Sequence, residues 1–185
     1  MADVVQRAKA LVVNPLKVSQ PVGASLAFLG LARAMPLEHG ARGCAAFNKL
    51  FFTRHFREPI ALQTTAMDVA TVVMGADENV VQALHTICAR HAPEIIGLIA
   101  TGLTETQGAD VPRSLKAFRT RYPEWNQVAI VPVSASDTLG CLETGYAHAL
   151  RAIIEELAPT GVPHRPATRP TQVNLLAPSM LTPGD

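Results

Sequence analysis

The stretch Glu94–Ala100, EIIGLIA, is apolar at alternate and at adjacent positions, and it is too short for a typical helix. Strands with this pattern are buried on both faces, because helices cover both sides of a parallel sheet. A second run of this kind lies at 127–133, QVAIVPV. The two runs predict neighbouring strands inside a parallel sheet.

Helical periodicity alternates with short apolar runs on either side of these strands. Further strands are expected at 10–13, 35–38, 59–64 and 173–176, and helices at 21–34, 44–55, 78–90, 110–121 and 139–157. Asp77 is expected to begin the helix at 78–90 and to cap its first N–H groups. Such alternation requires crossover connections. We therefore predict an α/β fold, a doubly wound and mostly parallel sheet with helices on both faces. Ligands of such folds bind beyond the carboxyl ends of the strands.

The chain is predicted to hold one α/β domain, residues 1–158. Residues 159–171 are expected to form a linker, because the stretch PTGVPHRPATRP places four prolines in twelve residues. Residues 172–185 are expected to be the start of a further element that the chain leaves incomplete.

Composition excludes several classes of protein. Of the 185 residues 48% are hydrophobic and 17% charged, which argues against global disorder. The net charge of +1 and the aromatic content of 5% argue against nucleic-acid binding. No apolar run reaches the roughly 18 residues of a membrane span, and the N-terminus lacks the order of a signal peptide. We expect a cytoplasmic protein.

Three cysteines, widely spaced, do not make a disulfide framework. Cys44 follows a glycine-containing turn and begins a predicted helix, where N–H groups and the helix dipole favour a thiolate. It is a candidate ligand or nucleophile, and packing of helix on sheet is the competing interpretation. Cys88 lies in an apolar helical pattern and is predicted to be core. Cys141 also lies near a helix start, and core packing is favoured there too.

Other candidates are less specific. His39 lies five residues before Cys44, and a satisfied turn histidine is favoured over a catalytic Cys–His pair. The segment 54–59, RHFREP, is consistent with a helix end, and 101–106, TGLTET, with a binding loop or with a cap of the next helix. No C-x-x-C, G-x-G-x-x-G or P-loop occurs, so a complete iron–sulfur, zinc or nucleotide site is not expected.

Several stretches resemble the NifN family of the nitrogenase component 1 superfamily. They are Asn14–Phe47, Arg54–Met67, Val73–Val80, Thr101–Asp110 and the terminal QVNLLAPSMLTPGD. Members are much longer, so this chain resembles their first domain. The resemblance implies a subunit of the scaffold on which the nitrogenase iron–molybdenum cofactor is matured.

The resemblance also implies a metal site. Cysteine ligands of the related nitrogenase beta subunit match Ser19, Cys44 and Gly102, of which only Cys44 is a thiol here. A hydroxyl ligand of that subunit falls near Cys141. In NifN the implied arrangement is a [4Fe–4S] cluster at a subunit interface, with three cysteines from NifE and one, matching Cys44, from this chain.

The implied partners are NifE, in an α2β2-type heterotetramer, and the nitrogenase iron protein, with neither nucleic acid nor membrane. The resemblance implies no bond chemistry for this chain alone. Two other interpretations stay open: a beta-type subunit of a nitrogenase or nitrogenase-like reductase, and a generic small-ligand α/β module that uses Cys44 as nucleophile or packing residue.

Overall fold

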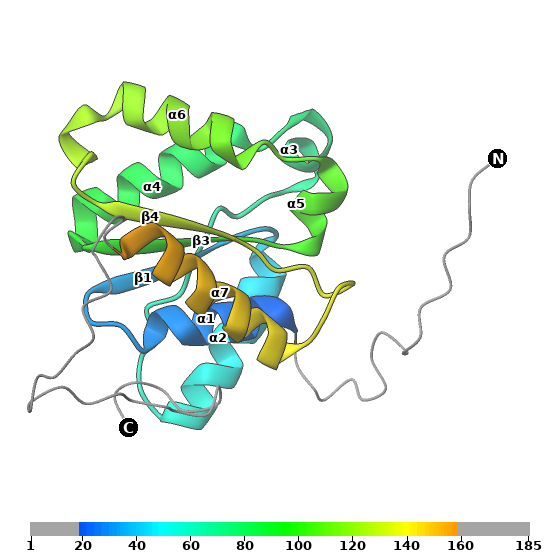
Figure 1. Ribbon diagram of the computed structural model, residues 1–185. Helices are drawn as coiled ribbons and strands as arrows, with labels where there is room; N and C mark the ends of the chain where they lie inside the picture. Colours follow the sequence, from blue (N-terminus) through cyan, green and yellow to red (C-terminus); the bar gives the residue numbers. More distant parts are fainter. Residues whose placement is uncertain (1–18, 159–185) are drawn as a thin grey trace, which may run out of the picture.

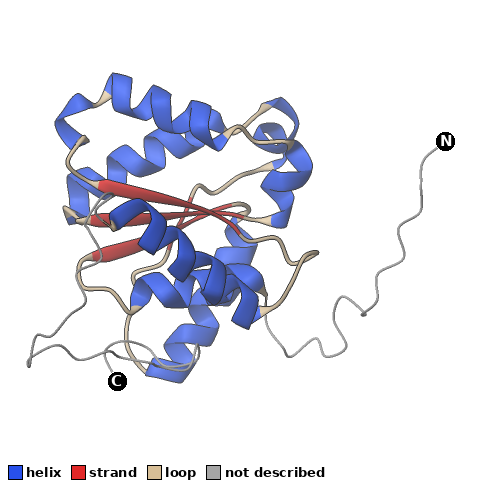
Figure 2. Ribbon diagram, in the orientation of Figure 1, coloured by secondary structure: helices blue, strands red, loops and turns tan. Residues whose placement is uncertain are grey.

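The fold is a parallel sheet covered by helices on both faces (Figures 1 and 2). The computed structural model describes residues 19–158. The described part forms a four-stranded sheet in the order β2-β1-β3-β4, with bounds Ala34–His39 for β1, Gln63–Thr64 for β2, Ile95–Ala100 for β3 and Ala129–Ser134 for β4. This arrangement confirms the predicted α/β class.

The helices divide between the two faces of the sheet. Their bounds are Gln20–Leu29 for α1, Arg42–Phe56 for α2, Val69–Met74 for α3, Asp77–His91 for α4, Gly102–Gln107 for α5, Val111–Arg121 for α6 and Leu142–Leu157 for α7. A short 3₁₀ turn at Pro123–Trp125 precedes β4. Figure 1 shows α4 and α6 over one face, and α1, α2 and α7 on the other.

The central strand β3 is buried on both sides, as its sequence predicts. Ile96 and Leu98 pack into a cluster with α4 and α6, whereas Ile99 packs into a second cluster with α1 and α7. Gly97 has no side chain because the Phe28 ring lies against it: a Cβ there would be 2.3 Å from a ring carbon. Both faces of the sheet therefore contribute to the hydrophobic core.

Glycines allow α1 and α7 to cross in close contact. A Cβ on Gly23 would lie 1.9 Å from the carbonyl oxygen of Leu142, and one on Gly145 would lie 2.0 Å from that of Gln20. Backbones approach this closely only where side chains are absent. The crossing places the N-terminus of α1 beside that of α7.

Several predicted boundaries are wrong. The helix expected at 21–34 ends at Leu29, because Gly30 and a left-handed Arg33 turn the chain into β1. Of 59–64 only the last two residues pair, and α7 begins three residues later than predicted. Asp77 is the first residue of α4 and does not cap it. The six-residue helices α3 and α5 were not predicted. The predicted strands at 10–13 and 173–176 and the linker lie outside the described residues.

Candidate functional site

Four helix N-termini converge at the carboxyl edge of the sheet. Helices α2, α5 and α7 each follow a strand, and α1 runs antiparallel to β1 before it, so all four begin at this edge. Ser19, Cys44, Gly102 and Cys141 lie at or beside these N-termini. Unpaired N–H groups at helix starts favour anions and thiolates. The structure thus brings the candidate positions to one edge.

Cys44 is exposed in the first turn of α2. Ala41, the residue that precedes this helix, forms no side-chain cap hydrogen bond, so it leaves the first N–H groups open to a ligand. Phe47 and Phe51 follow Cys44 at helical spacings of three and seven, and Leu50 lies beside them. Their side chains are 64%, 49% and 49% exposed in the order Phe47, Leu50, Phe51. The thiol therefore belongs to an exposed apolar surface, which we call the α2 face (Cys44, Phe47, Leu50, Phe51).

The turn between β1 and α2 is fixed by hydroxyl groups. The carbonyl oxygen of His39 accepts from Thr101 Oγ1 at 2.9 Å and from Thr104 Oγ1 at 3.4 Å. The N–H of Gly40 donates to Thr65 Oγ1 at 3.2 Å. A Cβ on Gly40 would lie 2.7 Å from Thr101 Oγ1, so a larger residue would displace this threonine. The threonines of 101–106 therefore anchor the turn that leads to Cys44.

His39 is a buried strand residue rather than a turn histidine. Its Nδ1 bonds Thr65 Oγ1 at 2.9 Å, so this nitrogen is engaged with a hydroxyl and not with the thiol of Cys44. Burial lowers the pKa of His39 to about 4, which keeps the ring neutral at pH 7. The favoured interpretation, a histidine whose ring is hydrogen-bonded within the fold, is confirmed. The residue lies at the end of β1, however, and not in the turn where it was expected.

Ser19 and Gly102 fit their surroundings without thiols. The Ser19 hydroxyl bonds the carboxyl of Asp137, which also accepts the backbone N–H of Gln20 at 2.8 Å. Burial raises the pKa of Asp137. A Cβ on Gly102 would lie 3.2 Å from Ser136 Oγ, a tight contact that Ser136 would have to relieve. The loop after β4 therefore packs against both positions.

The other two cysteines have structural places. Cys88 is buried in α4, and burial raises the pKa of its thiol, as a core position predicts. The prediction that Cys141 packs in the core is wrong, because the residue is half-buried and is the N-cap residue of α7. Its Sγ donates to Glu143 Oε2 at 2.9 Å, and its backbone N–H donates to Thr144 Oγ1 at 2.9 Å. The segment 54–59 ends α2 through a left-handed Arg57, as a helix end should.

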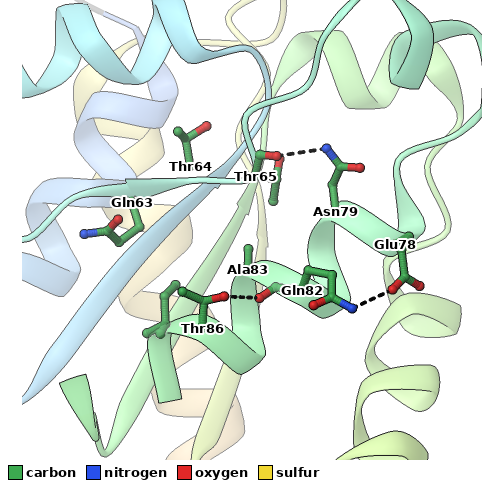
Figure 3. Close-up of a pocket in the computed structure, with 9 residues that line it drawn as sticks. Gln63, Thr64, Thr65, Glu78, Asn79, Gln82, Ala83 and Thr86 are labelled. Carbon is green, nitrogen blue, oxygen red and sulfur yellow. Dashed lines mark hydrogen bonds between the residues drawn. The ribbon is translucent and has the colours of Figure 1, made fainter. Parts of the chain in front are cut away.

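A hollow of about 350 Å³ lies elsewhere, between β2 and α4 (Figure 3). Two hydrogen bonds join residues of its lining: Asn79 donates to the Thr65 carbonyl at 3.0 Å, and Gln82 donates to Glu78 at 2.7 Å. Cys44 is not among its lining residues. Within residues 19–158, no three or more His, Cys, Asp or Glu side chains are grouped so as to hold a metal ion.

Comparison with known proteins shows the family to which the chain belongs. The sequence pattern of nitrogenase component 1 type oxidoreductases matches residues 19–185. The chain belongs to that family. A solved structure of nitrogenase Cp1 at pH 6.5 superposes with a TM-score of 0.75 and 30% identity over 85% of this chain and 34% of the other. Nitrogenase Cp1 at pH 5, at 15% identity and a TM-score of 0.60, shows the fold alone.

Sequence relatives within the nitrogenase component 1 family carry the name NifN, nitrogenase iron–molybdenum cofactor biosynthesis protein. The Klebsiella pneumoniae protein is 46% identical and the Nostoc sp. protein 48% identical, each over 100% of this chain. The chain spans 40% of the length of these two relatives. The expected resemblance to NifN is confirmed. In the part of the chain described here, no helix has the length and apolar character needed to cross a membrane.

Proposed function

We propose that this chain is part of a NifN-type subunit of the scaffold on which the nitrogenase iron–molybdenum cofactor is matured. Relatives with this name match the whole chain at 46% and 48% identity. The observation that carries the proposal at the level of the site is the exposed thiol of Cys44 at the carboxyl edge of a nitrogenase component 1 fold. In this function the chain holds and orients groups and breaks no bond of its own.

Cys44 is the single ligand that the chain gives to a [4Fe–4S] cluster. Such a cluster needs about four ligands, commonly thiolates. Within residues 19–158 no group of three or more potential ligands supports a complete site, and the positions at Ser19 and Gly102 carry no thiol. One exposed thiol at a helix start fits a shared cluster better than an internal one. When bound, the cluster supplies electron transfer.

The α2 face supports the assignment of a partner subunit. Three ligands from another chain can reach Cys44 only if that chain covers the surface around it. Phe47, Leu50 and Phe51 surround the thiol with large apolar side chains, and apolar patches of this kind mark association sites. NifE is the proposed partner, in an α2β2-type heterotetramer. Its contact would remove water from the site and so influence the cluster potential.

The residues of this chain prepare the thiol for metal binding. Cys44 lies in the first turn of α2, where free N–H groups favour a bound anion. The threonine hydroxyls on the His39 carbonyl hold the turn that places α2 against the sheet. The nitrogenase iron protein is the second proposed partner, as the electron donor to the assembled scaffold.

The test is anaerobic co-expression of the full-length protein with NifE, followed by iron analysis and electron paramagnetic resonance. Cys44→Ala should alter the cluster signal and the reduction potential, because ligand identity controls both. Cys88→Ala, in the core, should leave them unchanged, and Cys141→Ala serves as a second control. If Cys44→Ala matches wild type while Cys141→Ala does not, the wrong thiol has been assigned.

Two other results would favour the alternatives. An eight-iron cluster in the wild-type complex would indicate a beta-type subunit of a nitrogenase or a nitrogenase-like reductase. A complex free of iron and sulfide would favour a small-ligand α/β module in which Cys44 acts as nucleophile or packing residue.

A further inference from the structure

A buried carboxyl group lies beneath the helix that carries Cys44. Glu38, in β1, is 1% exposed. Its Oε1 accepts two hydrogen bonds, one from Ser25 Oγ of α1 at 3.0 Å and one from Asn48 Nδ2 of α2 at 2.7 Å. One side-chain oxygen on strand β1 thus links α1 and α2 to the sheet.

The contact with Asn48 is important because α2 is held by few side chains. Of its fifteen residues only Ala45, Asn48 and Phe52 are buried. Ala45 is small, and Phe52 lies toward the far end of the helix. In the first two turns the one buried polar side chain is therefore Asn48, which forms the directional contact with the sheet.

Asn48 lies one helical turn after Cys44. In an α-helix the N–H of a residue bonds the carbonyl four positions earlier, so the backbone of Asn48 is tied to that of Cys44. Apolar contacts tolerate small sliding and rotation, whereas a hydrogen bond weakens steeply as its geometry departs from linear. The Glu38–Asn48 bond therefore restricts both the rotation and the height of the turn that presents the thiol.

An apolar residue would fill the place of Glu38 at a lower cost of burial. Its other oxygen, Oε2, is buried without a hydrogen-bond partner in the structure, and such groups are unfavourable. Burial raises the pKa of the carboxyl, and the charge of Asp137 acts in the same direction. The charged form of this buried carboxyl is thus less favourable than it would be in water.

We propose that Glu38 is a positioning residue that, through Asn48, fixes the first turns of α2 and so sets the place of the Cys44 sulfur. Its relevance to a cluster rests on the proposed function; the anchoring of α2 does not. Glu38→Gln retains the acceptor oxygen and should leave the anchoring of α2 as it is in wild type. Glu38→Ala and Asn48→Ala both remove the link.

The first readout is amide hydrogen exchange of residues 42–49 in the metal-free full-length protein. Both alanine variants should exchange at least about tenfold faster there, in line with the loss of a buried hydrogen bond. The matched control is Ser114→Ala: Ser114 is buried in α6 on the other face of the sheet and donates to Asp77 at 3.0 Å. This control should lower the free energy of unfolding by a similar amount. Exchange of residues 42–49 should then increase only as far as this lower global stability requires.

The second readout is the reduction potential of the cluster in the complex with NifE. Both alanine variants should shift it, and Glu38→Gln and Ser114→Ala should not. Asn48→Ala keeps the Glu38–Ser25 bond, so it remains informative if Glu38→Ala fails to fold. The proposal would be overturned if, in Glu38→Ala and Asn48→Ala, exchange at 42–49 rose only as much as the loss of global stability explains, as expected for Ser114→Ala. A wild-type complex without iron would instead overturn the proposed function and leave the exchange result valid.

Discussion

His39 and Glu38 are adjacent in β1, and burial shifts their pKa values in opposite directions. The pKa of His39 falls from 6.5 to about 4, and that of Glu38 rises from 4.5. Between pH 6.5 and 4 the unfolded chain binds a proton at His39 and the folded chain does not, so acid destabilises the fold. At Glu38 the folded chain retains the proton, so stability is lost as the pH rises above 4.5 toward the raised pKa.

These two slopes have opposite signs in the wild-type protein. In Glu38→Gln the His39 effect should emerge, with the free energy of unfolding falling by about 3 kcal/mol from pH 7 to pH 4. In His39→Gln that acid loss should disappear. Denaturant unfolding at several pH values measures both. Equal slopes in the two variants would contradict the assignment of these groups.

The sequence predicts isolated residues better than it predicts contacts between distant ones. Cys88 lies in the core and Cys44 at a helix start, as the local patterns indicate. Glu38 was missed, because a glutamate in PLEH gives no sign of burial by itself. Its setting depends on Ser25 and Asn48, and no local pattern links these three positions.

At the level of helices, the crossing of α1 and α7 depends on missing side chains. Gly145→Ala would place a methyl group 2.0 Å from the Gln20 carbonyl oxygen, so the helices must separate. We expect a loss of about 1–3 kcal/mol in the free energy of unfolding. Gly43→Ala in α2 is the matched control, since a Cβ there meets nothing within 4 Å. It should be neutral or stabilising by up to about 1 kcal/mol. Equal effects in urea unfolding would contradict the close crossing.

The α2 face gives a second prediction at this scale. Phe47→Asp combined with Phe51→Asp should have a modest effect on stability, because the two side chains are 64% and 49% exposed in that order. Association with NifE should weaken by more than about tenfold, since aromatic anchors dominate interfaces. Lys49→Asp changes an exposed residue of the same helix outside the α2 face and should have a smaller effect. Sedimentation velocity measures the association; an unchanged affinity would place NifE elsewhere.

Elements differ in how far the sequence determines them. β3 and β4 follow from their apolar runs, and α4 and α6 from long amphipathic patterns. Helices α3 and α5 have six residues each, less than two turns, which is too short for a clear period. The early end of α1 follows from tertiary packing, because the chain must turn at Arg33 to enter β1.

For the molecule as a whole, the chain is expected to bind no stable [4Fe–4S] cluster alone. Of the two thiols at the carboxyl edge only that of Cys44 is exposed, and within residues 19–158 no group of three or more potential ligands completes a site. Anaerobic reconstitution followed by iron analysis and visible absorption tests this prediction. About four irons per monomer, with the broad absorption of a cluster, would contradict it.

Exposed apolar side chains also predict the behaviour of the chain without its partner. Besides the α2 face, α3 exposes Val69, Val73 and Met74. Patches of this kind promote association, so the chain alone should form concentration-dependent oligomers. Light scattering over a dilution series measures this. A single monomeric species at high concentration would show that these surfaces need no cover.

The edges of the sheet determine which form that association takes. Among residues 19–158, β2 at one edge of the sheet pairs through only two residues, and β4 at the other edge carries an exposed Pro132, which has no N–H to donate. Short and proline-bearing edges are poor templates for a further strand. Self-association of the native chain should therefore occur through helix surfaces and be reversed by dilution. It should not increase the fluorescence of an amyloid-binding dye. The yield of native protein after overexpression would then depend on co-expressing a partner that covers these helix surfaces, and not on preventing fibrils.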